Sequence, residues 1–161
     1  MSKRDMCHYC GCREMPLLRD YIAEHERATN FGGEAVRAID RGDLRRARHL
    51  LAEMATELAA HWQGEETGLF RVMAREEMFA EHIAPLIREH REMGELLATV
   101  DILEPEGQQA IRDAVFHLYE HISKEEDGLY PASLTALGGN ERDAAMDAWH
   151  EAHPGTRMIQ G

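Results

Sequence analysis

The sequence lacks any long apolar run. No stretch approaches the roughly 20 apolar residues that cross a bilayer, and residues 1–6 lack the apolar core of a secretion signal. Basic residues are also scarce, since 18 Lys and Arg against 30 Asp and Glu give a formal net charge of −12. Nucleic acids and anionic membranes need basic patches, so the charge argues against both as partners. We expect a cytoplasmic protein.

Strand signals are absent as well. The sequence has no alternating run of β-branched residues and no Asn-Gly hairpin. Hydrophobic residues at 43% and charged residues at 30% are ordinary for a globular chain, and 161 residues suffice for one domain with a single buried core. The composition therefore favours a single all-α domain.

Cysteine is confined to one N-terminal segment, where Cys7, Cys10 and Cys12 lie close together. An odd number of cysteines at this spacing is not a disulfide framework. Three thiolates can bind zinc or an iron–sulfur unit, with histidine or water as the fourth ligand. The alternative is a reducing, oxidation-sensitive tail. Both interpretations stay open for residues 1–15, which we predict to form a separate Cys-rich segment.

A repeated motif is what the sequence does contain. Residues 61–70 read HWQGEETGLF and residues 121–130 read HISKEEDGLY, while Glu24-His25 upstream recurs as Glu89-His90. On a helix, a histidine and a glutamate four residues apart have adjacent side chains on one face. Each half of the chain therefore carries a His-x-x-x-Glu clip and one further histidine.

Apolar periodicity predicts four long helices and one short one. Their expected ranges are Pro16 to about Asp40, Leu44 to about Ala74, Glu81 to Val100, Glu104 to Tyr130-Pro131, and Glu141 to Ala152. Short connections between the long helices predict an up-down-up-down four-helix bundle over residues 16–137, made of a duplicated helix pair. An additional short C-terminal helix and a tail are expected in residues 138–161. Pro85 is expected in or near the first turn of the third helix.

The four motif histidines lie on the apolar faces of these helices. The positions three and seven residues before them are all apolar: Ile22, Leu58, Ile87 and Leu118, and Leu18, Met54, Ile83 and Ala114. Buried imidazoles and carboxylates without partners cost several kcal/mol each, on the order of magnitude usual for polar groups, and a cation removes that cost. Imidazole nitrogen and carboxylate oxygen suit iron, manganese or zinc. The pattern predicts one shared metal site at the bundle centre.

Within each acidic pair, the four-residue step places one glutamate inward. Glu65 and Glu125 fit that step, whereas Glu66 and Glu126 are expected to face solvent or to contact the ligands from outside. The histidines outside the repeat carry no predicted role: His8, His49, His150 and His153.

These residues resemble the hemerythrin-like family, also called the HHE cation-binding domain, over roughly residues 16–137. The resemblance implies a four-helix bundle that holds two iron ions, with two bridging carboxylates and otherwise histidine ligands. It implies that Glu65 and Glu125 are the bridges and that O2 or a related small ligand binds at an open coordination position. The implied ligand set is His25, His61, Glu65, His90, His121 and Glu125.

The sequence departs from the oxygen-carrying members at one position. Those proteins have two histidines four residues apart on the third helix, and here Leu86 lies four residues before His90. His117, four residues before His121, is a candidate replacement on the fourth helix. Tyr21, four residues before His25, could donate a hydrogen bond or supply an oxygen ligand. A site with fewer histidines favours peroxide, nitric oxide or iron-level chemistry over oxygen carriage. The Glu-x-x-His signature of ferritin-like proteins is missing.

We therefore expect a non-heme di-iron protein that binds or reacts with O2, peroxide or nitric oxide, in sensing or detoxification. The alternative is a non-catalytic metal-binding or iron-responsive module, with iron or zinc, that acts through a conformational change. A third hypothesis is a structural bundle whose polar core residues pair with one another.

Overall fold

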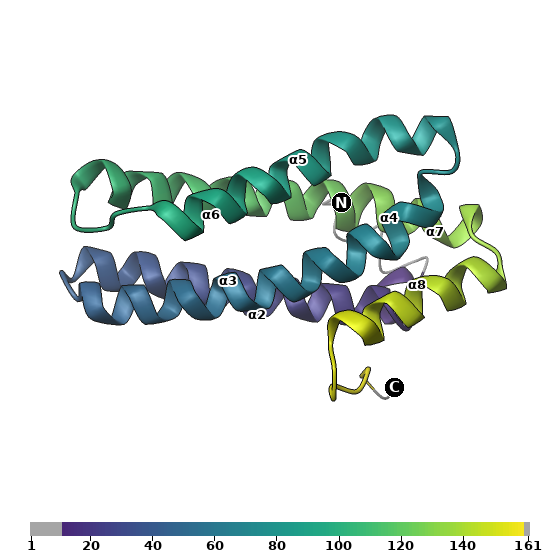
Figure 1. Ribbon diagram of the computed structural model, residues 1–161, viewed down its shortest axis with the longest axis horizontal. Helices are drawn as coiled ribbons and strands as arrows, with labels where there is room; N and C mark the ends of the chain where they lie inside the picture. The colour runs from purple at the N-terminus through teal and green to yellow at the C-terminus, as the bar shows by residue number, and fades with distance from the viewer. Residues whose placement is uncertain (1–10, 160–161) are drawn as a thin grey trace.

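The computed structural model describes residues 11–159, which are helical and contain no strand. Helices α2 (Leu18–Asp40) and α3 (Leu44–Thr67) lie side by side, and α5 (Glu77–Thr99) and α6 (Pro105–Lys124) follow the same long axis (Figure 1). Shorter elements complete the fold: η1 (Cys12–Glu14), α4 (Leu69–Met73), the π turn η2 (Glu125–Leu129), α7 (Tyr130–Ala136) and α8 (Gly139–Ala152). The predicted all-α helical bundle is confirmed. The up-down-up-down order and the three-part division of the chain stay predictions.

The connection between α2 and α3 follows the expected local signals. Gly42 has φ +76°, a left-handed conformation that favours glycine, and it ends the first helix. The Asp43 side chain then accepts a hydrogen bond from the Arg46 N–H and caps α3. The predicted end of the first helix near Asp40 and the predicted start of the second at Leu44 are confirmed.

Two predicted helix boundaries are wrong. Helix α5 begins at Glu77, so Pro85 lies inside the helix rather than in its first turn. The proline is tolerated there because the backbone carbonyl that loses its partner belongs to Glu81, an exposed residue that water can reach. The chain also continues past Tyr130-Pro131, because the π turn η2 leads directly into α7 and Pro131 occupies its first turn, where no N–H is needed.

Both motif glutamates lie where their helix becomes irregular. After Glu65 the helix breaks at Gly68, whose N–H donates to the Glu65 carbonyl. After Glu125 the helix widens, since the Tyr130 N–H donates to the Glu125 carbonyl five residues back. Such π turns are rare overall, and those that do occur are often found at functional sites. The duplicated motif therefore produces a local change of helical pitch in both halves.

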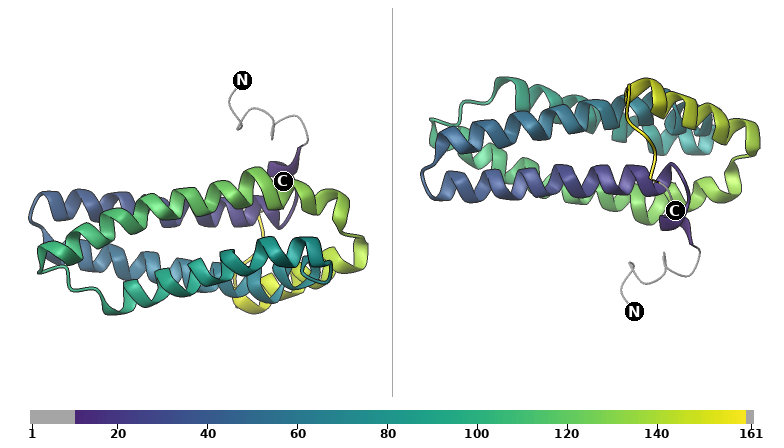
Figure 2. Two further views of the ribbon diagram at one scale, coloured as in Figure 1. Left: turned by 90° about the horizontal axis from the view of Figure 1, so that it is seen from above. Right: turned by 90° about the horizontal axis from the view of Figure 1, so that it is seen from below.

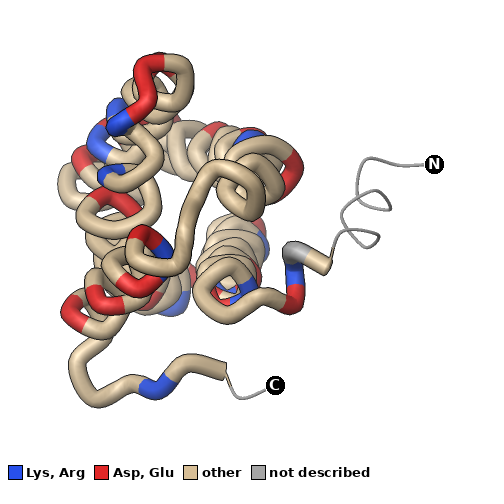
Figure 3. Tube along the Cα trace, turned by 90° about the vertical axis from the view of Figure 1, so that its right-hand side faces the viewer, with Lys and Arg blue, Asp and Glu red and all other residues tan. Residues whose placement is uncertain are grey.

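Helix α8 covers only one of the two motifs. A Cβ added at Gly68 would lie 2.6 Å from the Gly64 carbonyl oxygen and 3.1 Å from the Ala145 carbonyl oxygen, so α8 approaches α3 where side chains are missing. A Cβ at Gly128, the matching residue of the second motif, would meet nothing within 4 Å. The view along the bundle shows acidic residues on helices around it (Figure 3).

The polar centre lies between two apolar clusters. Along α2, Leu18 and Tyr21 belong to one cluster, His25 follows, and Ala28 begins the second. Within residues 11–159, no helix combines the length and the apolar character that a membrane span needs.

Candidate metal centre

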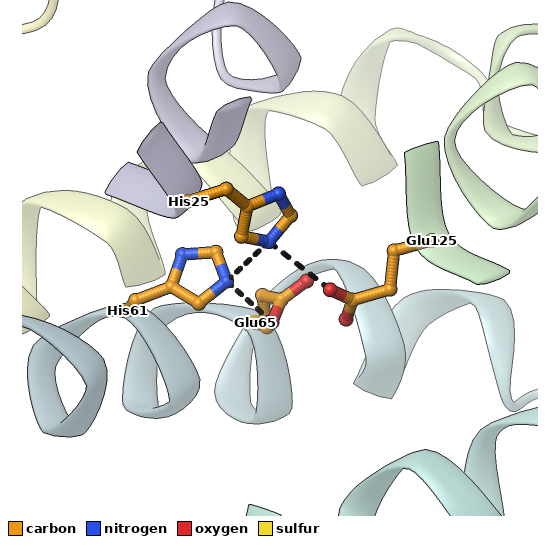
Figure 4. A group of neighbouring side chains, drawn as sticks. All are labelled: His25, His61, Glu65 and Glu125. Atoms are coloured by element: carbon orange, nitrogen blue, oxygen red, sulfur yellow. Dashed lines mark hydrogen bonds and ion pairs between the residues drawn. The ribbon is translucent and has the colours of Figure 1, made fainter. Parts of the chain in front are cut away.

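Six buried side chains from the four long helices and the π turn η2 converge at the centre of the bundle. None is more than 5% exposed, and they form two groups whose ligand atoms lie within 4.8 Å of one another. The first group is His25, His61, Glu65 and Glu125 (Figure 4). The second is His90, His121 and Glu125. The structure therefore brings together all six residues of the predicted ligand set, and Glu125 belongs to both groups.

Glu125 presents one carboxylate oxygen to each group. Its Oε1 lies 3.1 Å from His25 Nε2, while its Oε2 lies 3.4 Å from His121 Nε2 and 4.0 Å from His90 Nε2. Glu65 Oε1 likewise lies between the groups, 2.9 Å from His61 Nε2 and 3.7 Å from His90 Nε2. Each carboxylate therefore has histidines of both groups beside it, as a bridging ligand requires.

The positions of the ligand atoms suit a metal ion bound between them better than direct hydrogen bonds among the side chains. The two Nε2 atoms within each histidine pair approach to 2.9 Å for His25 and His61 and to 3.0 Å for His90 and His121. Glu65 Oε1 and both oxygens of Glu125 are buried without a hydrogen bond. Buried charges without partners are costly, and a metal ion between these atoms removes the cost. The donor set of imidazole nitrogens and carboxylate oxygens suits a transition metal.

A second set of carboxylates faces the outer side of the histidine rings. The distances from Nδ1 to the nearest carboxylate oxygen are 2.7 Å for His25 to Glu126, 2.8 Å for His121 to Glu89, 3.5 Å for His61 to Glu24, and 3.9 Å for His90 to Glu66. At His25 and His121 the carboxylate is hydrogen-bonded to Nδ1, which keeps the proton on that nitrogen and leaves the Nε2 lone pair free for a metal. At His61 and His90 the carboxylate lies at ion-pair distance from Nδ1 without a hydrogen bond.

These outer carboxylates repeat with the sequence duplication. Glu24 and Glu89, each next to the first histidine of its half, face the second histidine of the same half. Glu66 and Glu126 instead face the first histidine of the other half. The second glutamate of each acidic pair thus contacts a ligand from outside, and Arg13 also pairs with Glu126 at 2.7 Å.

Electrostatic interactions at the centre shift its pKa values in opposite directions. Burial alone would lower the pKa of His121, but the facing carboxylates of Glu125 and Glu89 raise it to about 9. Burial and the charge of Glu125 raise the pKa of Glu65. Burial would also raise the pKa of Glu125, yet His121 and His25 hold it well below its usual range. The metal-free centre thus keeps protons that a metal ion would displace.

Two tyrosines flank the centre, and only Tyr21 was among the predicted residues. The Tyr21 hydroxyl lies 3.5 Å from the Gly64 carbonyl oxygen, and its ring meets His61 edge-on, so it belongs to neither ligand group. Tyr130 instead donates a hydrogen bond to Glu65 Oε2 at 2.7 Å and stacks on His25. Phe70, the matching residue of the first motif, stacks on His90 without a hydroxyl. The Phe-to-Tyr difference within the repeat was the signal that could have identified Tyr130.

The remaining predicted residues lie away from the ligand groups. His117 is exposed on α6 and is in neither group, so it does not replace the nitrogen missing at the buried Leu86. Cys7 and Cys10 fall outside the described residues, and of Cys12 only the backbone, at the start of η1, is described. His153, which carried no predicted role, contacts Glu24 through an ion pair of 2.7 Å.

One family profile matches the chain. The hemerythrin HHE cation binding domain aligns with residues 17–133, which include all six side chains of the centre. No curated protein and no solved structure gave a significant match.

Proposed function

Because the chain belongs to the hemerythrin HHE cation-binding family, we propose that its centre holds two iron ions that bind or react with O2, peroxide or nitric oxide. The observation that carries the proposal is the position of Glu125, whose two oxygens face different histidine pairs. His25 and His61 would hold one ion, His90 and His121 the other, and Glu65 and Glu125 would bridge them. Sensing or detoxification of these small molecules is the role that we propose, in the cytoplasm and without nucleic acid or membrane partners.

Bound iron would supply an open coordination position and the electrons for reaction with the small ligand. The chain contributes the surroundings. Leu86 is 4% exposed and offers no nitrogen, so one position beside His90 has no protein ligand of this kind. Trp62 and Phe70 stack on the His90 ring from the first half of the chain and give it apolar neighbours. Tyr130 holds Glu65 through Oε2 and leaves Oε1 for the metal.

A groove between α5 and α6 leads to the second histidine pair. Its volume is about 550 Å³, and its lining includes both His90 and His121. Its charged residues are mostly acidic: Glu89, Glu92, Asp113 and Glu120 against Lys124. The groove therefore favours neutral molecules such as O2, nitric oxide and hydrogen peroxide over anions.

The acidic groove predicts a salt effect that depends on the charge of the ligand. Azide association with the iron-loaded protein should accelerate at least about threefold when ionic strength rises from about 0.01 to 0.15 M, because screening weakens the repulsion. Nitric oxide association should not change. The Asp113→Asn/Glu120→Gln variant should bind azide faster at low salt, while Glu53→Gln, an exposed change on α3, should not. Stopped-flow absorption measures the azide and nitric oxide association rates of the wild type and the azide association rates of both variants. An azide association rate that does not depend on salt would contradict entry of the ligand through this groove.

Metal content and the absorption spectrum test the proposed function itself. Protein expressed with iron and purified without oxygen should carry about two irons per chain, as the two ligand groups imply. Its near-ultraviolet absorption should rise on exposure to O2 or hydrogen peroxide, as a di-ferric centre forms. If the purified protein contained no transition metal, the proposal would be wrong. A colourless zinc protein that consumes no peroxide would favour the alternative, a non-catalytic metal-binding module.

A further inference from the structure

The C-terminal helix reaches the metal centre from outside the family match. Residues 17–133 align with the family, while Trp149 and His153 lie beyond them and both contact the buried Glu24. We propose that Trp149 and His153 are positioning residues for His61, and that through Glu24 they set how tightly the His25–His61 half of the centre holds its metal. This inference rests on the proposed metal binding and adds a control that acts on one half only.

Both oxygens of Glu24 are engaged between α8 and His61. Oε2 accepts a hydrogen bond from the Trp149 indole N–H at 3.0 Å. Oε1 lies 2.7 Å from His153 Nε2 and 3.5 Å from His61 Nδ1. Glu24 is 1% exposed, so these side chains replace the water that would otherwise solvate its charge. The carboxylate that faces His61 Nδ1 at ion-pair distance is therefore itself held in place by Trp149 and His153.

The His153 ring is itself held in one orientation. Its Nδ1–H donates to the Trp149 backbone carbonyl at 2.8 Å, and the ring stacks on the Trp149 indole with centroids 4.2 Å apart. With Nδ1 as a donor, a second proton on Nε2 is what allows the ring to face the Glu24 carboxylate. His153 and Glu24 thus form a charge pair in which neither partner can turn away without losing a contact.

Helix α8 is fixed in position on two sides, so the side chains that contact Glu24 are fixed as well. On one side, it packs on Gly64 and Gly68 of α3. On the other side, the tail after α8 crosses to the start of α2 (Figure 2). There the Ile159 N–H donates to Asp20 Oδ1 at 2.8 Å, and the Arg19 guanidinium donates to the Ile159 carbonyl. The C-terminal segment is therefore fixed to both helices that supply His25 and His61.

The second half of the centre is built differently. Glu89, the counterpart of Glu24, pairs with His121 Nδ1 at 2.8 Å and with Lys124 Nζ at 2.7 Å. Its side chain is 34% exposed, and the uncovered Gly128 shows that α8 has no equivalent there. Two carboxylates in the same role are thus held by Trp149 and His153 in one half and by a surface lysine in the other. A change in α8 should affect only the first half.

Release of iron to an excess of chelator tests the inference. In the Trp149→Phe/His153→Gln variant, one of the two irons should leave about tenfold faster than in the wild type, the lower end of what losing such an outer contact costs in affinity. The other iron should leave at the wild-type rate. Glu24→Gln identifies the phase of the first half, and Glu89→Gln identifies that of the second half. Asp147→Asn, an exposed change on the same helix, is the control and should leave both phases unchanged.

The outcomes separate positioning from a structural role. Acceleration of the phase that Glu24→Gln also accelerates supports the inference. Equal acceleration of both phases would mean that α8 only stabilises the fold, and no acceleration would mean that Glu24 does not depend on α8; either result overturns it. If the wild type loads zinc but no iron, the proposed iron chemistry fails, and the same measurement on the zinc protein still decides the inference.

Discussion

The Glu125→Gln variant should lose metal from both halves of the centre. Glu125 is the only residue shared by the two ligand groups among the described residues, and each of its oxygens faces a different histidine pair. The amide keeps the volume, but it removes the negative charge and turns one ligand oxygen into a nitrogen donor. Metal content after iron loading should fall from about two ions per chain to less than one. Elemental analysis of the purified variant measures this.

Two matched variants make the result specific to the bridge. Glu120→Gln changes an exposed glutamate of α6, five residues before Glu125, and should retain both irons. His121→Ala removes a ligand of only one group and should retain the ion held by His25 and His61. If Glu125→Gln still carries two irons, Glu125 is not the bridge and the two groups do not share a ligand.

Removing the metal should lower the thermal unfolding midpoint by about 5–15 °C. The stripped centre keeps four imidazoles and two carboxylates buried, and burial together with the charge of Glu125 disfavours ionisation of Glu65. A metal present at 100 to 1,000 times its dissociation constant stabilises the fold by about 3–4 kcal/mol. In a domain of this size, each kcal/mol shifts the midpoint by about 2–4 °C. Circular dichroism melts with and without chelator measure the difference.

A double variant supplies the control for this stability effect. In Glu65→Gln/Glu125→Gln, the chelator should change nothing, because the bridging ligands are absent. Neutralising Glu65 removes its repulsion from Glu125, while neutralising Glu125 removes its attraction to His121 and His25, so the variant is compared with itself, with and without chelator. An unchanged midpoint for the chelated wild type would instead support the structural bundle, whose polar core residues pair with one another.

Local periodicity explains why so much of the centre could be predicted. A helix brings residues four apart onto one face, so His61 and Glu65 are neighbours in any helix that contains them. The apolar residues three and seven positions before each histidine indicate which face is buried. The Asp43 cap is equally local, because the bond from the Arg46 N–H spans three residues. Such features need no knowledge of the other helices.

The errors concern contacts that depend on how the helices are placed. The Tyr130-Pro131 boundary was wrong because the π turn keeps the chain helical past the proline. Tyr21 shares a face with His25, yet its hydroxyl points to Gly64, whereas Tyr130 reaches Glu65 across the bundle. The pairing of Glu126 with His25 joins residues 101 positions apart. Periodicity along one helix carries no information about such pairs.

The sequence by itself thus determined an all-α fold, the burial of the repeated histidines and glutamates, and their suitability for a metal, because each follows from spacing along one helix. Only the tertiary structure decided how the two halves differ. Tyr130 against Phe70, and α8 over Gly68 against open space at Gly128, make one half enclosed and leave the other beside a groove. The physical reason is that a duplicated sequence specifies equivalent ligands, while a single C-terminal helix can cover only one of two equivalent faces.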